Sequence, residues 1–247
     1  MKCKLCLQNK LLIKAHIIPD FMYQDLYDEN HQIYKVDLTS EDYSKSKKVP
    51  TGIYDKNILC ANCDTNIIGS YETYASTILY GGVMNENDKP IFQRMIDVNN
   101  VESMKVYNVD YTKFKLFLLS LLWRSSITSQ ILFKDVKLSI DDEENIRLML
   151  LKGDAGDVYD YPCVILTFIR TSLHKEFFSS PRKDLAEEKI HIVIHGIIYT
   201  FIISKNNMPF DYINYSSINK NNEMALVYLD EVKAKKFMNN YFGLNLY

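Results

Sequence analysis

Two pairs of cysteines near the N-terminus have the spacing of metal ligands. Cys3 and Cys6 form one Cys-x-x-Cys pair, and Cys60 and Cys63 form a second. Two intervening residues let both thiolates of a pair turn toward one ion, and two pairs complete the tetrahedral shell that Zn²⁺ prefers. A redox-active pair is the alternative, but two such pairs in one unit favour metal binding. The sequence therefore predicts a structural zinc site.

The segment between the two pairs is too long for a simple zinc ribbon. It holds 53 residues, whereas ribbon-type sites separate their cysteine pairs by roughly 15–20 residues. Loops of such length without secondary structure are uncommon in compact domains. We therefore expect this segment to carry strands or helices of its own. The fifth cysteine, Cys163, lies in an apolar run and is expected to pack in the core.

Residues that suit chemistry on a phosphodiester lie within this segment and just after it. His16 stands in the sequence KAHIIP at 14–19, and Asn57 and Asp64 stand in DKNILCANCD at 55–64. An imidazole with a pKa near 6.5 suits proton transfer at neutral pH. A carboxylate suits a hard cation such as Mg²⁺. A histidine followed by apolar residues is usually a packed core residue, so the order of all these parts carries more weight than His16 alone.

That order resembles the zinc-containing branch of the HNH, or ββα-metal, endonucleases. The resemblance covers about the first 80 residues. It implies an N-terminal ββα-metal unit stapled by the four-cysteine zinc site. It also implies that His16 is the general base that draws a proton from water, and that Asn57 orients this histidine. Asp64 would bind a catalytic Mg²⁺ or Mn²⁺ ion.

The chain departs from the family pattern at the residue before the histidine. Many of these enzymes have Asp or His there as a second metal ligand, whereas this chain has Ala15. Asp20 or Glu72 is the expected replacement. Glu72 follows Asp64 by eight residues, about two helical turns, and therefore lies on the same helix face. For both carboxylates an ordinary polar surface position is the competing interpretation.

The sequence further along is similar to bacterial proteins that begin with the same cysteine and His-Ile-Ile-Pro pattern. The similarity rests on LSLLWRSS at 119–126, ENIR at 144–147 and Tyr161-Pro162. Some of those proteins are linked to defence against phage, and the resemblance implies such a role here. Arg124, beside the only tryptophan, is expected to cap a buried helix, or else to contact phosphate or the first unit.

An α+β fold of two units is expected to position these residues. Residues 1–82 form the zinc-bound HNH-like nuclease domain, and Gly81-Gly82 marks its end. Residues 83–247 form an α+β C-terminal domain that would select substrate, sense a signal or bind a partner. Its expected elements are helices at 112–133 and 141–152, strands at 163–169, 189–194, 197–204 and 225–229, a turn at His195-Gly196, and a helix at 230–241.

The composition indicates a folded protein that does not coat nucleic acid by charge alone. Hydrophobic residues make up 47% of the 247 residues, and the formal net charge is −2. Any contact with nucleic acid must therefore be local. The most apolar stretch, 116–123, is much shorter than the roughly 20 residues of a membrane span. No signal-peptide pattern is visible, so we expect a cytoplasmic protein without membrane contact.

Together these features predict a metal-dependent endonuclease that hydrolyses phosphodiester bonds in nucleic acid, with DNA as the expected substrate. The alternative is a catalytically inactive zinc-stapled module that binds nucleic acid or protein. A transcription regulator is disfavoured, because the helix expected after Cys63 carries no Lys or Arg. A toxin-like nuclease restrained by a regulatory protein partner, or a homo-oligomer, is also compatible with the sequence.

Overall fold

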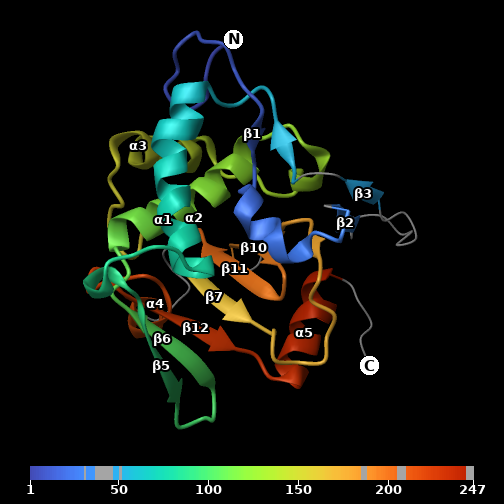
Figure 1. The fold of residues 1–247 in the computed structure, drawn as a ribbon, viewed down its shortest axis with the longest axis vertical. Helices are drawn as coiled ribbons and strands as arrows, with labels where there is room; N and C mark the ends of the chain where they lie inside the picture. Colours follow the sequence, from blue (N-terminus) through green and yellow to red (C-terminus); the bar gives the residue numbers. More distant parts are fainter. Residues whose placement is uncertain (31, 37–46, 50–51, 185–187, 205–209, 243–247) are drawn as a thin grey trace.

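The protein has a mixed α and β fold, in agreement with the expected class. A small two-stranded sheet and several helices lie toward the N-terminal end, and a large sheet lies at the opposite end (Figure 1). The structure is a computed structural model, and it describes residues 1–30, 32–36, 47–49, 52–184, 188–204 and 210–242.

Ten strands of the described chain form the large sheet. Their order is β3-β2-β8-β10-β11-β7-β12-β6-β5, and β9 pairs with β10 beside this path. Neighbouring strands are antiparallel except for the β2–β8 and β7–β12 pairs, which are parallel. The strands of this sheet are β2 (Ile33–Val36), β3 (Lys47–Val49), β5 (Ile91–Ile96), β6 (Glu102–Tyr107), β7 (Cys163–Thr167), β8 (Phe178–Ser179), β9 (Arg182–Asp184), β10 (Lys189–Ile194), β11 (Ile197–Ile202) and β12 (Glu223–Tyr228).

The small sheet pairs β1 (Ala15–His16) with β4 (Tyr54–Asp55) in antiparallel register. A π-helical segment, η3 (Asn62–Ile68), follows β4 and runs directly into α1. The described residues also form short 3-10 helices, η1 (Asp20–Leu26), η4 (Glu86–Asp88) and η5 (Ile131–Phe133). The α-helices are α1 (Gly69–Tyr80), α2 (Tyr111–Ile127), α3 (Ile140–Lys152), α4 (Phe210–Ser216) and α5 (Glu231–Phe242).

The two long helices predicted in the second unit are confirmed. The α2 helix begins after Asp110, whose carboxylate accepts a hydrogen bond from the Lys113 N–H at 2.9 Å. It ends six residues earlier than expected, because Thr128 is extended. The α3 helix begins after Ser139 and ends at Gly153, whose φ of 70° suits a glycine cap. No helix of the described chain combines the length and apolar character needed to cross a membrane.

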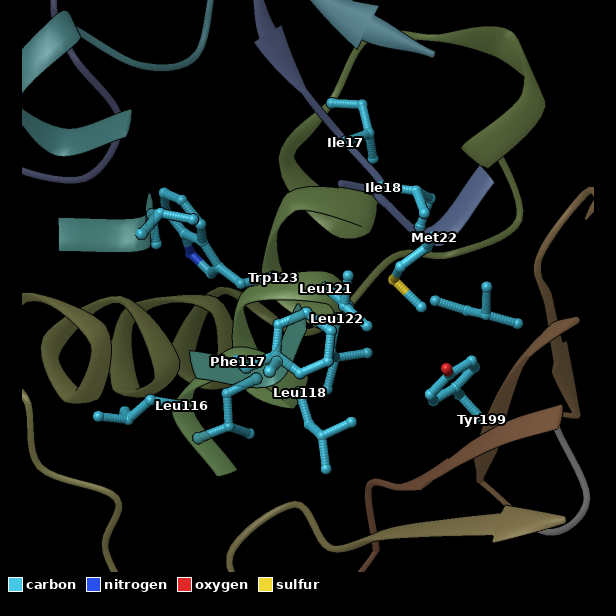
Figure 2. Close-up of a cluster of buried hydrophobic side chains, with 14 of the residues drawn as sticks. Ile17, Ile18, Met22, Leu116, Phe117, Leu118, Leu121, Leu122, Trp123 and Tyr199 are labelled. Atoms are coloured by element: carbon cyan, nitrogen blue, oxygen red, sulfur yellow. The ribbon is translucent and has the colours of Figure 1, made fainter. Parts of the chain in front are cut away.

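The α2 helix lies in the hydrophobic core, and every residue from Phe114 to Ile127 is buried. Figure 2 shows its Phe117 and Leu121 side chains clustered with Ile17 and Met22 from the N-terminal segment and with Tyr199 from β11. All five side chains are essentially buried. One continuous core therefore contains residues from both sides of position 82.

The predicted boundary at residue 82 coincides with the end of α1. This helix stops at Tyr80, and Gly81 follows with a φ of 81°. The large sheet nevertheless includes β2 and β3 from the first unit, because Lys35 of β2 pairs with Phe178 of β8. The shared sheet and core couple the two predicted units, so the first unit is not packed independently of the second.

The predicted hairpin around His195 and Gly196 is confirmed. Ile194 pairs with Ile197, so the loop between β10 and β11 has two residues. Both have positive φ, 47° for His195 and 73° for Gly196. This backbone is that of a type I′ turn, whose twist matches that of the flanking strands.

Candidate functional site

The four cysteines of the two Cys-x-x-Cys pairs lie together. The Sγ atoms of Cys3, Cys6, Cys60 and Cys63 all lie within 4.8 Å of one another, and three of the four residues are buried. In the described part of the chain, no other group of three or more His, Cys, Asp or Glu side chains lies close enough to hold a metal. Clustered sulfur ligands are the donors that Zn²⁺ binds in structural sites.

Backbone hydrogen bonds shape both pairs in the same way. The Leu7 N–H donates to the Cys3 carbonyl at 2.9 Å, and the Asp64 N–H donates to the Cys60 carbonyl at 3.0 Å. Each pair thus closes a turn that brings its sulfurs to one side. The Cys60 N–H also donates to Cys3 Sγ at 3.4 Å, which links the two pairs directly.

The donor set fits a zinc ion. The four residues are thiols rather than disulfides. Burial, followed by hydrogen bonds with Cys6 and Cys60, raises the pKa of the Cys63 thiol. Metal binding requires thiolates, and a divalent cation among the sulfurs supplies the positive charge that stabilises them. The cluster is therefore suited to a cation and poorly suited to four bare thiolates.

His16, Asp64 and Glu72 line one open cleft beside the cysteine cluster. His16 belongs to β1, Asp64 follows Cys63 in η3, and Glu72 lies on α1. The cleft has a volume of about 520 Å³. A π-helical segment such as η3 is rare and often lies at functional sites. The second cysteine pair therefore fixes the start of the helix that carries both carboxylates.

Arg124 of α2 reaches this cleft from the core. Its side chain is only 1% exposed. Nη1 donates to the His16 carbonyl at 2.7 Å, and Nη2 lies 2.7 Å from Glu72 Oε1. The Glu72 contact has the distance of an ion pair but not the angle of a hydrogen bond, so Oε1 accepts no hydrogen bond from the described residues. Of the alternatives raised for Arg124, contact with the first unit is observed, and within α2 its Nε donates to the Ser120 carbonyl at 3.2 Å rather than to a carbonyl at the helix end.

Burial dominates the proton affinities in the cleft. It lowers the pKa of His16 below its usual value, although the Asp20 and Glu72 carboxylates oppose this shift. It raises the pKa of Asp64, an effect that the Arg124 cation opposes and Glu72 reinforces. His16 is consequently neutral at pH 7 and able to accept a proton.

The other two predicted site residues have different positions. Asp20 lines the cleft, and its Oδ1 accepts a hydrogen bond from the Tyr27 hydroxyl at 2.6 Å. Asn57 is exposed in the turn after β4 and is not part of the cleft lining. Its backbone N–H donates to Asp55 Oδ1 at 2.9 Å. The structure brings His16, Asp64, Glu72 and Asp20 to one cleft, and it leaves Asn57 outside.

Asp55, which the sequence analysis did not single out, anchors the strand that pairs with β1. Its side chain is buried, and Oδ2 accepts hydrogen bonds from the Thr128 hydroxyl at 2.8 Å and from the Ser129 N–H and hydroxyl at 3.0 Å. Burial alone raises the pKa of Asp55, but these hydrogen bonds outweigh burial and hold the pKa below its usual range. Asp55 therefore ties β4 to the end of α2.

Asp64 and Glu72 offer oxygen donors to a hard cation. Mg²⁺ usually takes one or two carboxylates from the protein and keeps water and substrate phosphate as its other ligands. The carboxylates of this cleft fit that type of site. Described residues do not bring three ligand groups together here, so the cleft is not a complete cage for a metal.

The comparisons with known proteins identify no family. No family model matches the chain, and neither a curated protein nor a solved structure matches it. Conclusions about function therefore rest on the cysteine cluster and the cleft beside it.

Proposed function

We propose that this protein is a zinc-stapled, metal-dependent endonuclease of the HNH type. The convergence of His16, Asp64 and Glu72 on one open cleft, directly after the second cysteine pair, carries the proposal. β1, β4 and the helix after Cys63 would form the ββα-metal unit. Nucleic acid, DNA first, is the proposed substrate. A role in defence against phage is proposed from the resemblance of the sequence alone.

The proposed mechanism assigns proton transfer to His16. Its imidazole accepts a proton from a water molecule while the water oxygen attacks phosphorus. The bond from phosphorus to the leaving oxygen breaks, and that oxygen takes a proton from solvent in the open cleft. Asp64 and Glu72 would hold Mg²⁺ or Mn²⁺, which supplies positive charge to the phosphate oxygens. Arg124 holds the His16 carbonyl, so the histidine strand keeps its position during the reaction.

The four cysteines have a structural role in this proposal. A four-thiolate zinc site has no open position for water or substrate. Zinc would fix the start of η3, where Asp64 follows Cys63. The catalytic cation is thus a different ion at a different place.

One observation favours a catalytically inactive binding module as the second candidate. Glu72 already has a cation, the Arg124 guanidinium, 2.7 Å from its Oε1. With Ala15 in the position of a usual ligand, the carboxylates of Asp64 and Asp20 and the second oxygen of Glu72 are left for a metal. A module of this kind would keep the zinc and bind nucleic acid or protein without cutting.

A plasmid-nicking assay separates the two candidates. We expect the wild-type protein to nick supercoiled plasmid with Mg²⁺ or Mn²⁺, and His16→Ala to lose at least about 100-fold of this activity, the contribution of a general base. His174→Ala is the matched control, because His174 is exposed and lies outside the cleft. Absence of metal-dependent nicking, or full activity in His16→Ala, would contradict the endonuclease proposal.

A further inference from the structure

A second hollow is lined by residues from the C-terminal end of α1 and from the β10–β11 hairpin. It has a volume of about 430 Å³, within the usual range for small-ligand sites. Aromatic rings and charged groups face it together: Tyr80, Tyr199, Arg170, Lys175, His195 and Asp25. We name this hollow the hairpin pocket.

The hairpin pocket continues the histidine cleft along α1. Helix positions 72, 73, 76 and 77 line the cleft, and positions 79 and 80 line the hairpin pocket. At 3.6 residues per turn these positions share one face of the helix. Phe21 of the cleft and Tyr80 of the pocket pack edge to face, with ring centroids 5.7 Å apart. A nucleic-acid strand lying along this helix face would pass from the cleft into the hairpin pocket across the Phe21–Tyr80 ring pair.

Two cations of the hairpin pocket suit a phosphate group. The Arg170 guanidinium lies over the Tyr228 ring, 3.8 Å from its centroid, and is also paired with Glu102. The Lys175 ammonium donates to the Ile169 carbonyl at 3.1 Å. These contacts fix both side chains, and each retains N–H donors for a ligand. Asp25 is the only carboxylate of the pocket lining, and Glu102 offsets part of the Arg170 charge from outside it.

His195 adds a polar group with no assigned partner. Its Nδ1 is buried and makes no hydrogen bond within the described chain. The residue also has a φ of 47°, a conformation that a non-glycine residue adopts at some energetic cost and that is frequent at binding sites. The Tyr80 hydroxyl is a second polar group, because burial and then the Asp25 carboxylate raise its pKa to about 12 and keep it a neutral donor.

We infer that the hairpin pocket is a nucleotide subsite, which holds one unpaired nucleotide of the strand whose phosphodiester lies in the histidine cleft. Arg170 and Lys175 bind its phosphate, and the exposed Tyr80 ring contacts its base. This inference rests on the proposed function and names its substrate class as nucleic acid with an unpaired segment. From Glu72 to Tyr80 the helix rises about 12 Å, so the subsite lies a few nucleotides from the cut.

Binding of a fluorescein-labelled single-stranded 20-mer DNA tests the subsite, with anisotropy measured in the full chain across a salt series without added Mg²⁺. We expect the double variant R170A/K175A to bind about tenfold more weakly. Loss of both cations from this one phosphate should also reduce the slope of log K against log salt by about 0.7. Arg94→Ala is the matched control, because Arg94 pairs with the same Glu102 but does not line the pocket. It should match the wild type in affinity and slope.

The subsite would be overturned if R170A/K175A bound the 20-mer with the same affinity and salt slope as the wild type. It would also be overturned if the wild type bound a duplex 20-mer as tightly as the single strand, or bound no DNA at all. Binding of dAMP as tightly as the 20-mer would indicate a site for free nucleotide instead and also overturn it. Cleavage reports separately on the proposed function. If the wild type binds DNA through Arg170 and Lys175 but never nicks plasmid, the subsite is supported and the endonuclease proposal is contradicted. If the wild type nicks plasmid and the double variant binds DNA as tightly as the wild type, the endonuclease proposal is supported and the subsite is contradicted.

Discussion

Nη2 of Arg124 lies 2.7 Å from Oε1 of Glu72, although the two residues belong to different predicted units. The pair is largely removed from water, since the arginine side chain is 1% exposed and the glutamate side chain 24% exposed. The same guanidinium donates a hydrogen bond to the His16 carbonyl. The core helix of the second unit therefore supports the proposed catalytic cleft of the first.

Removing this arginine should destabilise the whole fold. Arg124→Met leaves the Glu72 carboxylate half-buried without its cation, and we expect a loss of roughly 3–5 kcal/mol in the free energy of unfolding. Urea unfolding followed by circular dichroism measures it. Arg94→Met is the control, because its ion pair is at the surface, and its unfolding midpoint should stay near that of the wild type. An equally small effect at Arg124 would show that the buried pair contributes little.

Zinc removal should unfold the N-terminal part of the chain. We expect purified protein to contain one zinc ion per chain, measured by elemental analysis, because four clustered thiols form a complete shell. Cys60→Ser should lose most of the zinc and lower the midpoint of thermal unfolding. Cys163→Ala is the matched control, since Cys163 is buried in β7 away from the cluster. Equal zinc content in both variants would argue against the site.

The Asp55 carboxylate should make stability depend on pH in the acidic range. Its folded-state pKa is held below the usual value, so the ionised group contributes stability above the unfolded pKa of about 3.9 and loses it as pH falls through the folded pKa. Asp55→Asn should reduce stability by roughly 2–4 kcal/mol at pH 7. The difference from the wild type should shrink below pH 4.

Unfolding curves at several pH values between 3 and 7 check this prediction. Asp135→Asn serves as the control, because Asp135 is exposed, and it should follow the wild type at every pH. A gap between Asp55→Asn and the wild type that is constant across the range would mean that the Asp55 hydrogen bonds stabilise the fold without a shifted proton equilibrium.

Features set by short-range spacing could be predicted from the sequence. The cysteine cluster follows from two Cys-x-x-Cys turns, and α3 follows from a capping serine before three acidic residues. The β10–β11 hairpin follows from two β-branched runs around His195-Gly196. In α3, in the hairpin and within each cysteine pair, the deciding residues lie close together in the sequence, whereas the meeting of the two pairs across 53 residues follows from the ligand number of zinc.

Features set by distant partners could not be predicted. Asp55 meets Thr128 and Ser129 only after folding, 73 and 74 residues further along the chain, so no local pattern marks it as an anchor. The pairing of β2 with β8 also joins segments from opposite sides of residue 82. The β5–β6 hairpin carries exposed apolar residues, a pattern that does not alternate as a half-buried strand would.

The pH dependence of nicking should identify His16 as the base. Only the neutral imidazole accepts a proton, so activity rises as pH rises through the His16 pKa. Burial lowers that pKa below its usual value of about 6.5, and the acidic limb of kcat/KM should therefore lie below pH 6.5. Asp20→Asn should move the limb to still lower pH, because the Asp20 carboxylate raises the His16 pKa.

Proton NMR of the His16 ring gives the same pKa without reference to activity, and the exposed His174 ring is an internal reference. Agreement between the NMR pKa and the acidic limb, in the wild type and in Asp20→Asn, would assign the limb to His16. A limb that stays fixed while the NMR pKa moves would assign it to another group, and the general base would then have to be sought outside β1.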